Sequence, residues 1–136
     1  MRYKLLILIC FTFILCGCSN TLTCIKETDK EISKVNITFE KGMPTTLNWK
    51  KTLVYADGDA SIEMNYLEEK DYYNKFADVK GLSYKIDKKD RQGKIVIDVN
   101  VDYSEFDIRT HIYLPAIYID IDNNRFYLEN HGYICK

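Results

Sequence analysis

The residues with the clearest chemical meaning are cysteines, of which the chain has five, three of them within the first 18 residues. The run Leu15-Cys16-Gly17-Cys18 places an aliphatic residue three positions before a cysteine and a small residue directly before it. This is the pattern of a lipobox, in which a signal peptidase cleaves before the cysteine and its thiol carries a diacylglyceryl thioether. The spacing therefore predicts lipid modification of Cys18.

The segment before Cys18 supports this interpretation. Met1–Lys4 carries two positive charges and no acid, and Leu5–Leu15 is almost unbroken apolar sequence. An apolar run of about eleven residues suits a signal peptide and is too short to span a bilayer. We therefore expect a lipoprotein signal peptide at 1–17, and a buried apolar segment with an incidental cysteine is the alternative. Two acyl chains would hold the mature chain on the extracytoplasmic face of the cell membrane.

Cys24 and Cys135 are the two thiols left once the signal peptide has gone and Cys18 is lipidated. Disulfides persist outside the membrane, and the termini of a domain often lie close together. Both cysteines also sit in short extended-looking segments. We therefore predict a disulfide between them, against two rivals: a metal site that adds His131, and a pair of free buried thiols.

The elements that must position these cysteines follow from the periodicity of the mature chain. Residues 18–23 form the lipidated cysteine and a polar tether, and 24–136 form a single domain. Period-2 alternation predicts strands at 35–39, 47–55, 82–86 and 95–103, and a helical stripe predicts a helix over 61–77 capped by Asp59 or Ser61. Alternation is brief at 117–121, and 104–114 is ambiguous. Asp122–His131 is either a helix capped by Asp122 or a strand.

These elements predict an α+β domain in which an antiparallel sheet of four to five strands packs against one main helix, with a short C-terminal helix. One face of the sheet and the helix stripe should then form the core. The apolar residues expected there are Val35, Ile37, Phe39, Leu47, Trp49, Ile62, Tyr73, Phe76, Ile95, Ile97, Val99 and Val101.

Three stretches resemble the YehR-type small bacterial lipoproteins, a family of unknown function. In addition to the lipobox, the first stretch is Phe76–Asp87, where a helix runs through Gly81 into a strand, and the second is Val99–Asp107; the third is the C-terminal ending. The ending Tyr127–Lys136, taken with Leu22–Cys24, resembles a Gram-positive branch of that family. The resemblance implies a β-rich α+β fold and a helix at Asp122–Asn130, and it brings no activity or cofactor.

Other motifs with possible chemistry have simpler explanations. Asp120–Asn124 opens like a calcium loop, but Arg125 stands where an EF-hand needs glycine and His131 where it needs glutamate, so a polar turn or helix cap fits better. Asp98 and Asp102 could act as an acid and a base, although alternating acids on a wet sheet face are far commoner. We expect no metal, no cofactor and no catalytic residues.

Two further features bear on function. With 19 basic and 20 acidic side chains the formal net charge is -1, which argues against a nucleic-acid partner. The chain has 11 tyrosines, which could stack on ligands, although tyrosine is also simply frequent in sheets. Since no catalytic set can be assembled, we expect no enzyme but a lipid-anchored module that binds an envelope protein or glycan. The alternative is an envelope enzyme acting on cell-wall polymer.

Overall fold

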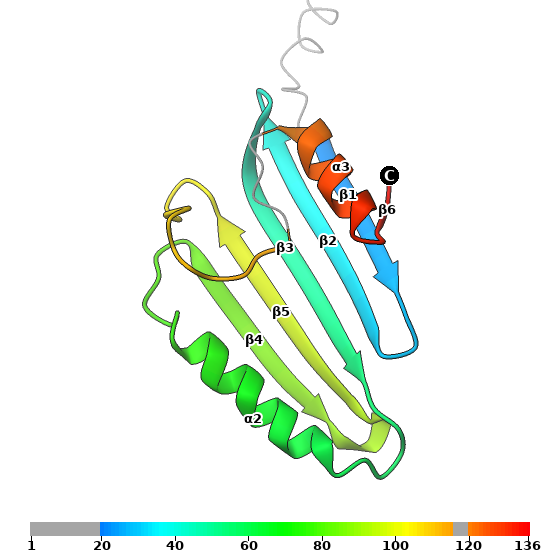
Figure 1. Ribbon diagram of the computed structural model, residues 1–136. Coiled ribbons are helices and arrows are strands. Elements are labelled where there is room, and N and C mark those ends of the chain that lie inside the picture. Colours follow the sequence, from blue (N-terminus) through cyan, green and yellow to red (C-terminus); the bar gives the residue numbers. More distant parts are fainter. Residues whose placement is uncertain (1–19, 116–119) are drawn as a thin grey trace, which may run out of the picture.

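Alternating side chains build a six-stranded antiparallel sheet in the computed structural model, which describes residues 20–115 and 120–136 (Figure 1). Two helices and a short 3-10 turn complete the fold. In chain order the elements are β1 (Asn20–Glu27), β2 (Glu31–Glu40), β3 (Met43–Val54), α2 (Ser61–Asn74), β4 (Leu82–Lys89), η1 (Asp90–Gln92), β5 (Lys94–Asp102), α3 (Ile121–Asn130) and β6 (Ile134–Cys135).

The strands lie in the order β4-β5-β3-β2-β1-β6, and every neighbouring pair is antiparallel. Tight turns join most of the neighbours; Lys41 and Gly42, both with positive φ, connect β2 to β3 as a two-residue hairpin requires. Two connections are longer: α2 carries the chain from β3 past β5 to the edge strand β4, and α3 lies in the connection from β5 to β6 at the opposite edge.

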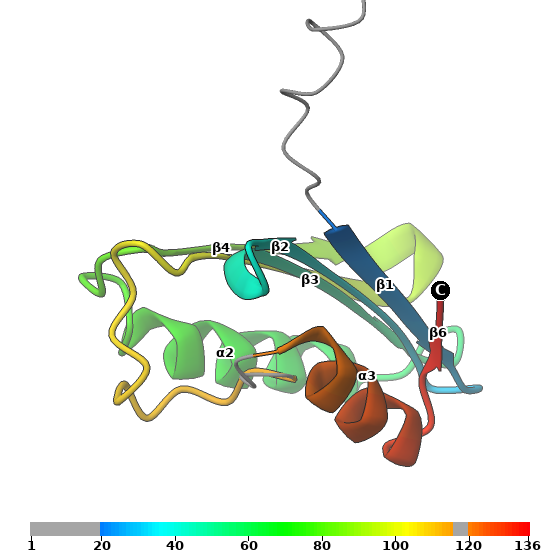
Figure 2. The same cartoon turned by 90° about the horizontal axis from the view of Figure 1, so that it is seen from above.

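Both helices cover the same face of the sheet, and the opposite face is open (Figure 2). Strand β5 shows the consequence most clearly, because Ile95, Ile97, Val99 and Val101 are at most 2% exposed while the residues between them are not buried. Of the twelve predicted core residues, ten are buried. Ile62 and Phe76 are only partly buried and pack against the edge of the core.

The sheet is wider than the sequence predicted, because β1 and β6 add to the four strands that alternation showed. Strand β1 already begins at Asn20, where it pairs with Phe39 of β2, so the polar tether predicted through Thr23 is wrong. Thr21 and Thr23 are polar because they face the open side, whereas Leu22 is fully buried. Cys18 and the signal segment 1–17 lie outside the described residues.

Helix α3 is present, as the resemblance implied, but its cap is Asp120 rather than Asp122. Asp120 has an extended backbone, and its side chain accepts a hydrogen bond of 2.8 Å from the backbone N–H of Asn123. The pKa of Asp120 is lowered by these hydrogen bonds from Asn123. The predicted alternation at 117–121 falls mostly on residues outside the described part of the chain.

Residues 103–115, ambiguous in the sequence, are an irregular segment that folds under the sheet. Phe106, Ile112 and Leu114 are buried in the core and so extend it beyond the strands and helices. Helix α2 is three residues shorter than expected and ends at Asn74, and its N-cap is Ala60, neither of the two predicted residues. Within 20–115 and 120–136, no helix is long and apolar enough to cross a membrane.

Candidate binding groove

Between α2 and β3 the covered side of the sheet opens into a cavity of about 530 Å³. This aromatic groove combines five aromatic rings with polar side chains. Three groups of residues line it: Trp49, Lys51 and Leu53 of β3 together with Tyr55, which follows that strand; Asn65, Glu68, Glu69, Tyr72 and Tyr73 of α2; and Tyr113.

The groove exists because the two helices stand apart. Helix α2 packs mainly on β4 and β5, while α3 packs on β1 and β6. The middle strand β3 therefore has no helix of its own over its inner face. Strand alternation makes Trp49, Lys51 and Leu53 point to that face, so the gap between the helices has an aromatic floor with one cationic group.

Hydrogen bonds to buried side chains fix the position of Trp49. Its indole N–H donates a 2.8 Å hydrogen bond to the hydroxyl of Ser33, which lies 2.7 Å from the hydroxyl of Tyr133. The indole is only 4% exposed, and Ser33 is fully buried. Because the polar atom of the ring is already satisfied by this chain, Trp49 presents only apolar surface to the groove.

Tyr113 is the most exposed aromatic residue named in the groove lining. Its ring meets the Trp49 ring edge to face, with 5.9 Å between the centroids, and its backbone N–H donates to the hydroxyl of Tyr72 at 3.0 Å. The side chain is nevertheless 60% exposed. A large ring held by its backbone yet open to solvent is available for stacking on a ligand.

Two charged groups of the groove are paired with each other. Lys51 Nζ lies 3.5 Å from Glu69 Oε1, and both side chains are largely buried, with 21% and 23% exposed. Burial is the main cause that raises the pKa of Tyr55; the Asn65 side chain opposes it, and the charges of nearby carboxylates add to it. The lining holds two glutamates against one lysine, a net charge of -1.

This arrangement suits binding better than hydrolysis. Glycosidase chemistry needs two carboxyl groups on either side of the bond that breaks. Glu68 and Glu69 are neighbours on one wall of the groove, and Glu69 already pairs with Lys51. The groove instead offers rings and hydrogen-bond acceptors, which are the features of a recognition site.

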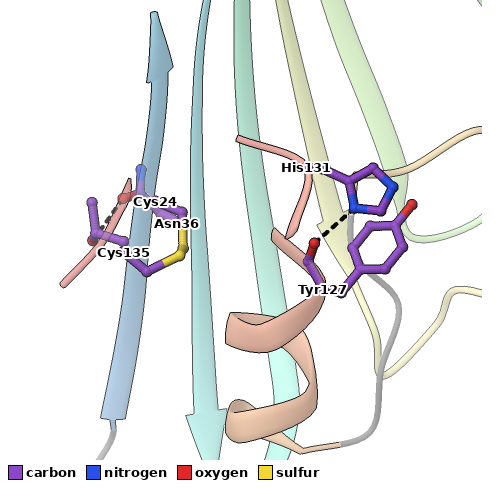
Figure 3. Close-up of a disulfide and its surroundings, with 6 residues drawn as sticks. Cys24, Asn36, Tyr127, His131 and Cys135 are labelled. Atoms are coloured by element: carbon purple, nitrogen blue, oxygen red, sulfur yellow. Dashed lines mark hydrogen bonds between the residues drawn. A yellow bond between two sulfur atoms is a disulfide. The ribbon is translucent and has the colours of Figure 1, made fainter. Parts of the chain in front are cut away.

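The predicted disulfide is present. Cys24 and Cys135 lie directly opposite each other in the β1–β6 pair, with their sulfur atoms bonded at 1.96 Å (Figure 3). The rival metal site is wrong for this structure, since His131 lies apart from the two cysteines. Its ring stacks on Tyr127, and its Nδ1 is 2.7 Å from the Tyr127 carbonyl oxygen.

The acidic motifs singled out in the sequence do not converge on a site. Asp98 accepts hydrogen bonds from Asn48 and Asn100 on the open face, and Asp102 accepts from the backbone N–H and hydroxyl of Ser104. The segment 57–59 is a turn, and Asp120 caps α3. These carboxylates therefore organise local backbone and neighbouring side chains.

The sequence did not assemble the aromatic groove. Tyr72, Tyr73 and Tyr113 are among the 11 tyrosines that could stack on ligands, but only the fold brings them to Trp49. Glu68 and Glu69 lie within the predicted helix 61–77, where charged side chains are ordinary. The one available signal was Lys51, which interrupts the apolar parity of its strand at the point where the covering helices leave β3 uncovered.

Comparison with known proteins shows a shared fold. No family model matches the chain, and no curated protein matches its sequence. The NMR structure of the YehR protein of E. coli is similar with a TM-score of 0.69 and 9% identity, covering 89% of this chain and 93% of that one. The NMR structure of a protein from Streptococcus pneumoniae TIGR4 is similar with a TM-score of 0.62 and 12% identity, covering 89% and 87%.

Proposed function

We propose that this chain is a lipid-anchored envelope protein that binds a component of the cell envelope in its aromatic groove. The observation that carries the binding half is the groove itself, in which a solvent-exposed ring, Tyr113, stands beside the fixed indole of Trp49. The anchoring half rests on the order of basic residues, apolar run, Gly17 and Cys18 at the N-terminus.

The shared fold supports a relationship to YehR-type lipoproteins, in the Gram-positive branch that the C-terminal sequence resembles. The disulfide fits this placement, because such bonds last in oxidising compartments outside the cytoplasm. Under this proposal β1 follows Cys18 after one residue, so the lipid anchor would hold the domain close to the membrane surface.

Anchoring is tested by mass spectrometry of the mature N-terminus and by cell fractionation. A diacylated cysteine at position 18 is expected, and Cys18→Ala should release the protein from the membrane fraction. A chain that keeps Met1, or a Cys18→Ala variant that stays bound to membranes, would contradict the anchor.

Binding is tested by capture from envelope extract on the immobilised mature chain, followed by mass spectrometry of proteins and glycans. The informative variant is Tyr113→Ala, and Phe126→Ala is its matched control, because Phe126 is a comparably exposed aromatic residue outside the groove. A species retained by the wild type and by Phe126→Ala but lost with Tyr113→Ala supports the proposal. Equal retention by all three contradicts it.

A further inference from the structure

We infer that the ligand of the aromatic groove carries a primary ammonium group, in the form of a lysine side chain on a peptide. The inference rests on the proposed function and names the chemistry that the groove recognises. It starts from charge, because the lining has two carboxylates and a single ammonium group, and that ammonium is already paired. An incoming cation would restore electrical balance at the groove.

The groove already holds an ammonium group of its own. Lys51 Nζ lies 5.9 Å from the centroid of the Trp49 ring and 3.5 Å from Glu69 Oε1. Attraction to the face of an aromatic ring together with a carboxylate is how proteins hold organic cations. Glu68 and the exposed ring of Tyr113 also line the groove, and among the described residues Glu68 has no ion pair that would already neutralise it.

Hydrogen bonding favours a primary ammonium over a quaternary one. The groove lining presents acceptors in the carboxylate of Glu68, the amide of Asn65 and the tyrosine hydroxyls. A lysine ammonium brings three N–H donors to such acceptors, whereas a quaternary ammonium has none. The paired Lys51 shows that this donor geometry is accommodated in the groove.

The size of the groove indicates a residue within a peptide. A volume of about 530 Å³ lies within the usual range for small-molecule sites and exceeds what a single alkylammonium chain fills. The Tyr113 ring offers apolar surface for the aliphatic part of a lysine side chain, which commonly packs on such surfaces while its charge stays at the polar rim.

The chain contains its own reporter for a test, since Trp49 is its one tryptophan and lies on the groove floor. The mature lipidated chain in non-ionic detergent is titrated with N-acetyl-lysine N-methylamide while tryptophan fluorescence is followed. We expect saturable binding with a Kd of about 1 mM, which is usual for a ligand of this size. The analogue acetylated on its side-chain nitrogen, and choline, should each bind at least about tenfold more weakly.

Variants separate charge and ring. Glu68→Gln should weaken binding about threefold, and Tyr113→Ala should do so by a similar factor. Asp71→Asn is the matched control, because it removes the same charge from the same helix at an exposed position outside the groove, and its Kd should not change. Thermal melting of each variant confirms that it is folded.

Equal affinity for the lysine probe and its acetylated analogue would overturn the inference, as would preference for choline or an equal loss in Asp71→Asn. These results leave the proposed function intact if envelope capture still depends on Tyr113. Loss of the Tyr113 dependence in that capture would instead count against the proposed function.

Discussion

Breaking the disulfide should cost the domain a large part of its stability. The bond joins residues separated by 111 positions, so it closes a loop that spans nearly the whole described domain. The chain-entropy model gives a loop of this length about 4.7 kcal/mol, and measured losses for native disulfides are typically about 2–4 kcal/mol. For a domain of this size we expect Tm to fall by roughly 10–15 °C.

The local structure shows where the loss appears first. Strand β6 has two residues, and beyond it the pairing with β1 continues through backbone hydrogen bonds in both directions between Thr23 and Lys136, at 3.2 and 2.8 Å. Without the covalent bond, only these hydrogen bonds, the contact of Tyr133 with Ser33 and the packing of α3 hold the C-terminus against the sheet. Hydrogen exchange at the Lys136 amide should therefore accelerate more than exchange in the centre of β5.

The assay compares thermal melting of a chain starting at Ser19 with its Cys24→Ala, Cys135→Ala and double variants, each with and without reductant. All three variants should melt together, and reductant should lower Tm only for the wild type, which keeps both sulfur atoms. Thiol titration of the unreduced, denatured wild type should find none. Two titratable thiols would contradict the disulfide, and a wild-type Tm that reductant does not change would contradict its contribution to stability.

Three other predictions concern the stability of the fold that holds the groove. Gly81→Ala should destabilise the domain far more than Gly58→Ala, as measured by thermal melting. Both glycines have positive φ, but a Cβ at Gly81 would lie 2.6 Å from backbone atoms, whereas a Cβ at Gly58 meets nothing within 4 Å. At Gly58 the cost is therefore only the roughly 1–2 kcal/mol of placing an L residue in the left-handed region. NMR titration should find the pKa of Asp120 below its ordinary value of 3.8. Because the pKa is lowered in the folded state, the stability that Asp120 contributes as a helix cap is complete above pH 3.8 and is lost as the pH falls through the folded pKa. Asp120→Ala should remove this pH-dependent contribution. Ile97→Ala should cost about 2–4 kcal/mol in chemical denaturation because its side chain is fully buried, while Asp98→Ala should cost less; the reverse order would mean that the covered face is wrongly assigned.

The elements that could be predicted well are strands in which apolar and polar residues alternate because one face is buried. Strand β5 alternates over its whole length. The pairing of Cys24 with Cys135 could be predicted because they are the two thiols left in the expected mature chain. Strand β1 was partly missed, since the polar residues Thr21 and Thr23 on the open face look like a tether until their pairing with β2 is known. The N-cap of α3 was placed two residues late because Asp120 and Asp122 both suit the role.

The groove could not be predicted, because no local pattern encodes it. Its walls come from three separated segments, and it exists only because the two helices pack over opposite ends of the strand order, on the same face of the sheet. Tyr113 belongs to an irregular segment without periodicity, and its position depends on the burial of Ile112 and Leu114 on either side of it. Burial of alternate residues outside any strand is a tertiary effect.

The most direct test of ligand binding in the aromatic groove is site-specific photo-crosslinking in intact cells. A benzophenone amino acid replaces Tyr113 in the groove lining, and the same residue replaces Phe126 on α3 as the control. We predict a discrete crosslinked envelope species from position 113 that is absent from position 126 and disappears when Cys18→Ala removes the anchor. Crosslinks that are identical at the two positions, or none from position 113, would contradict it.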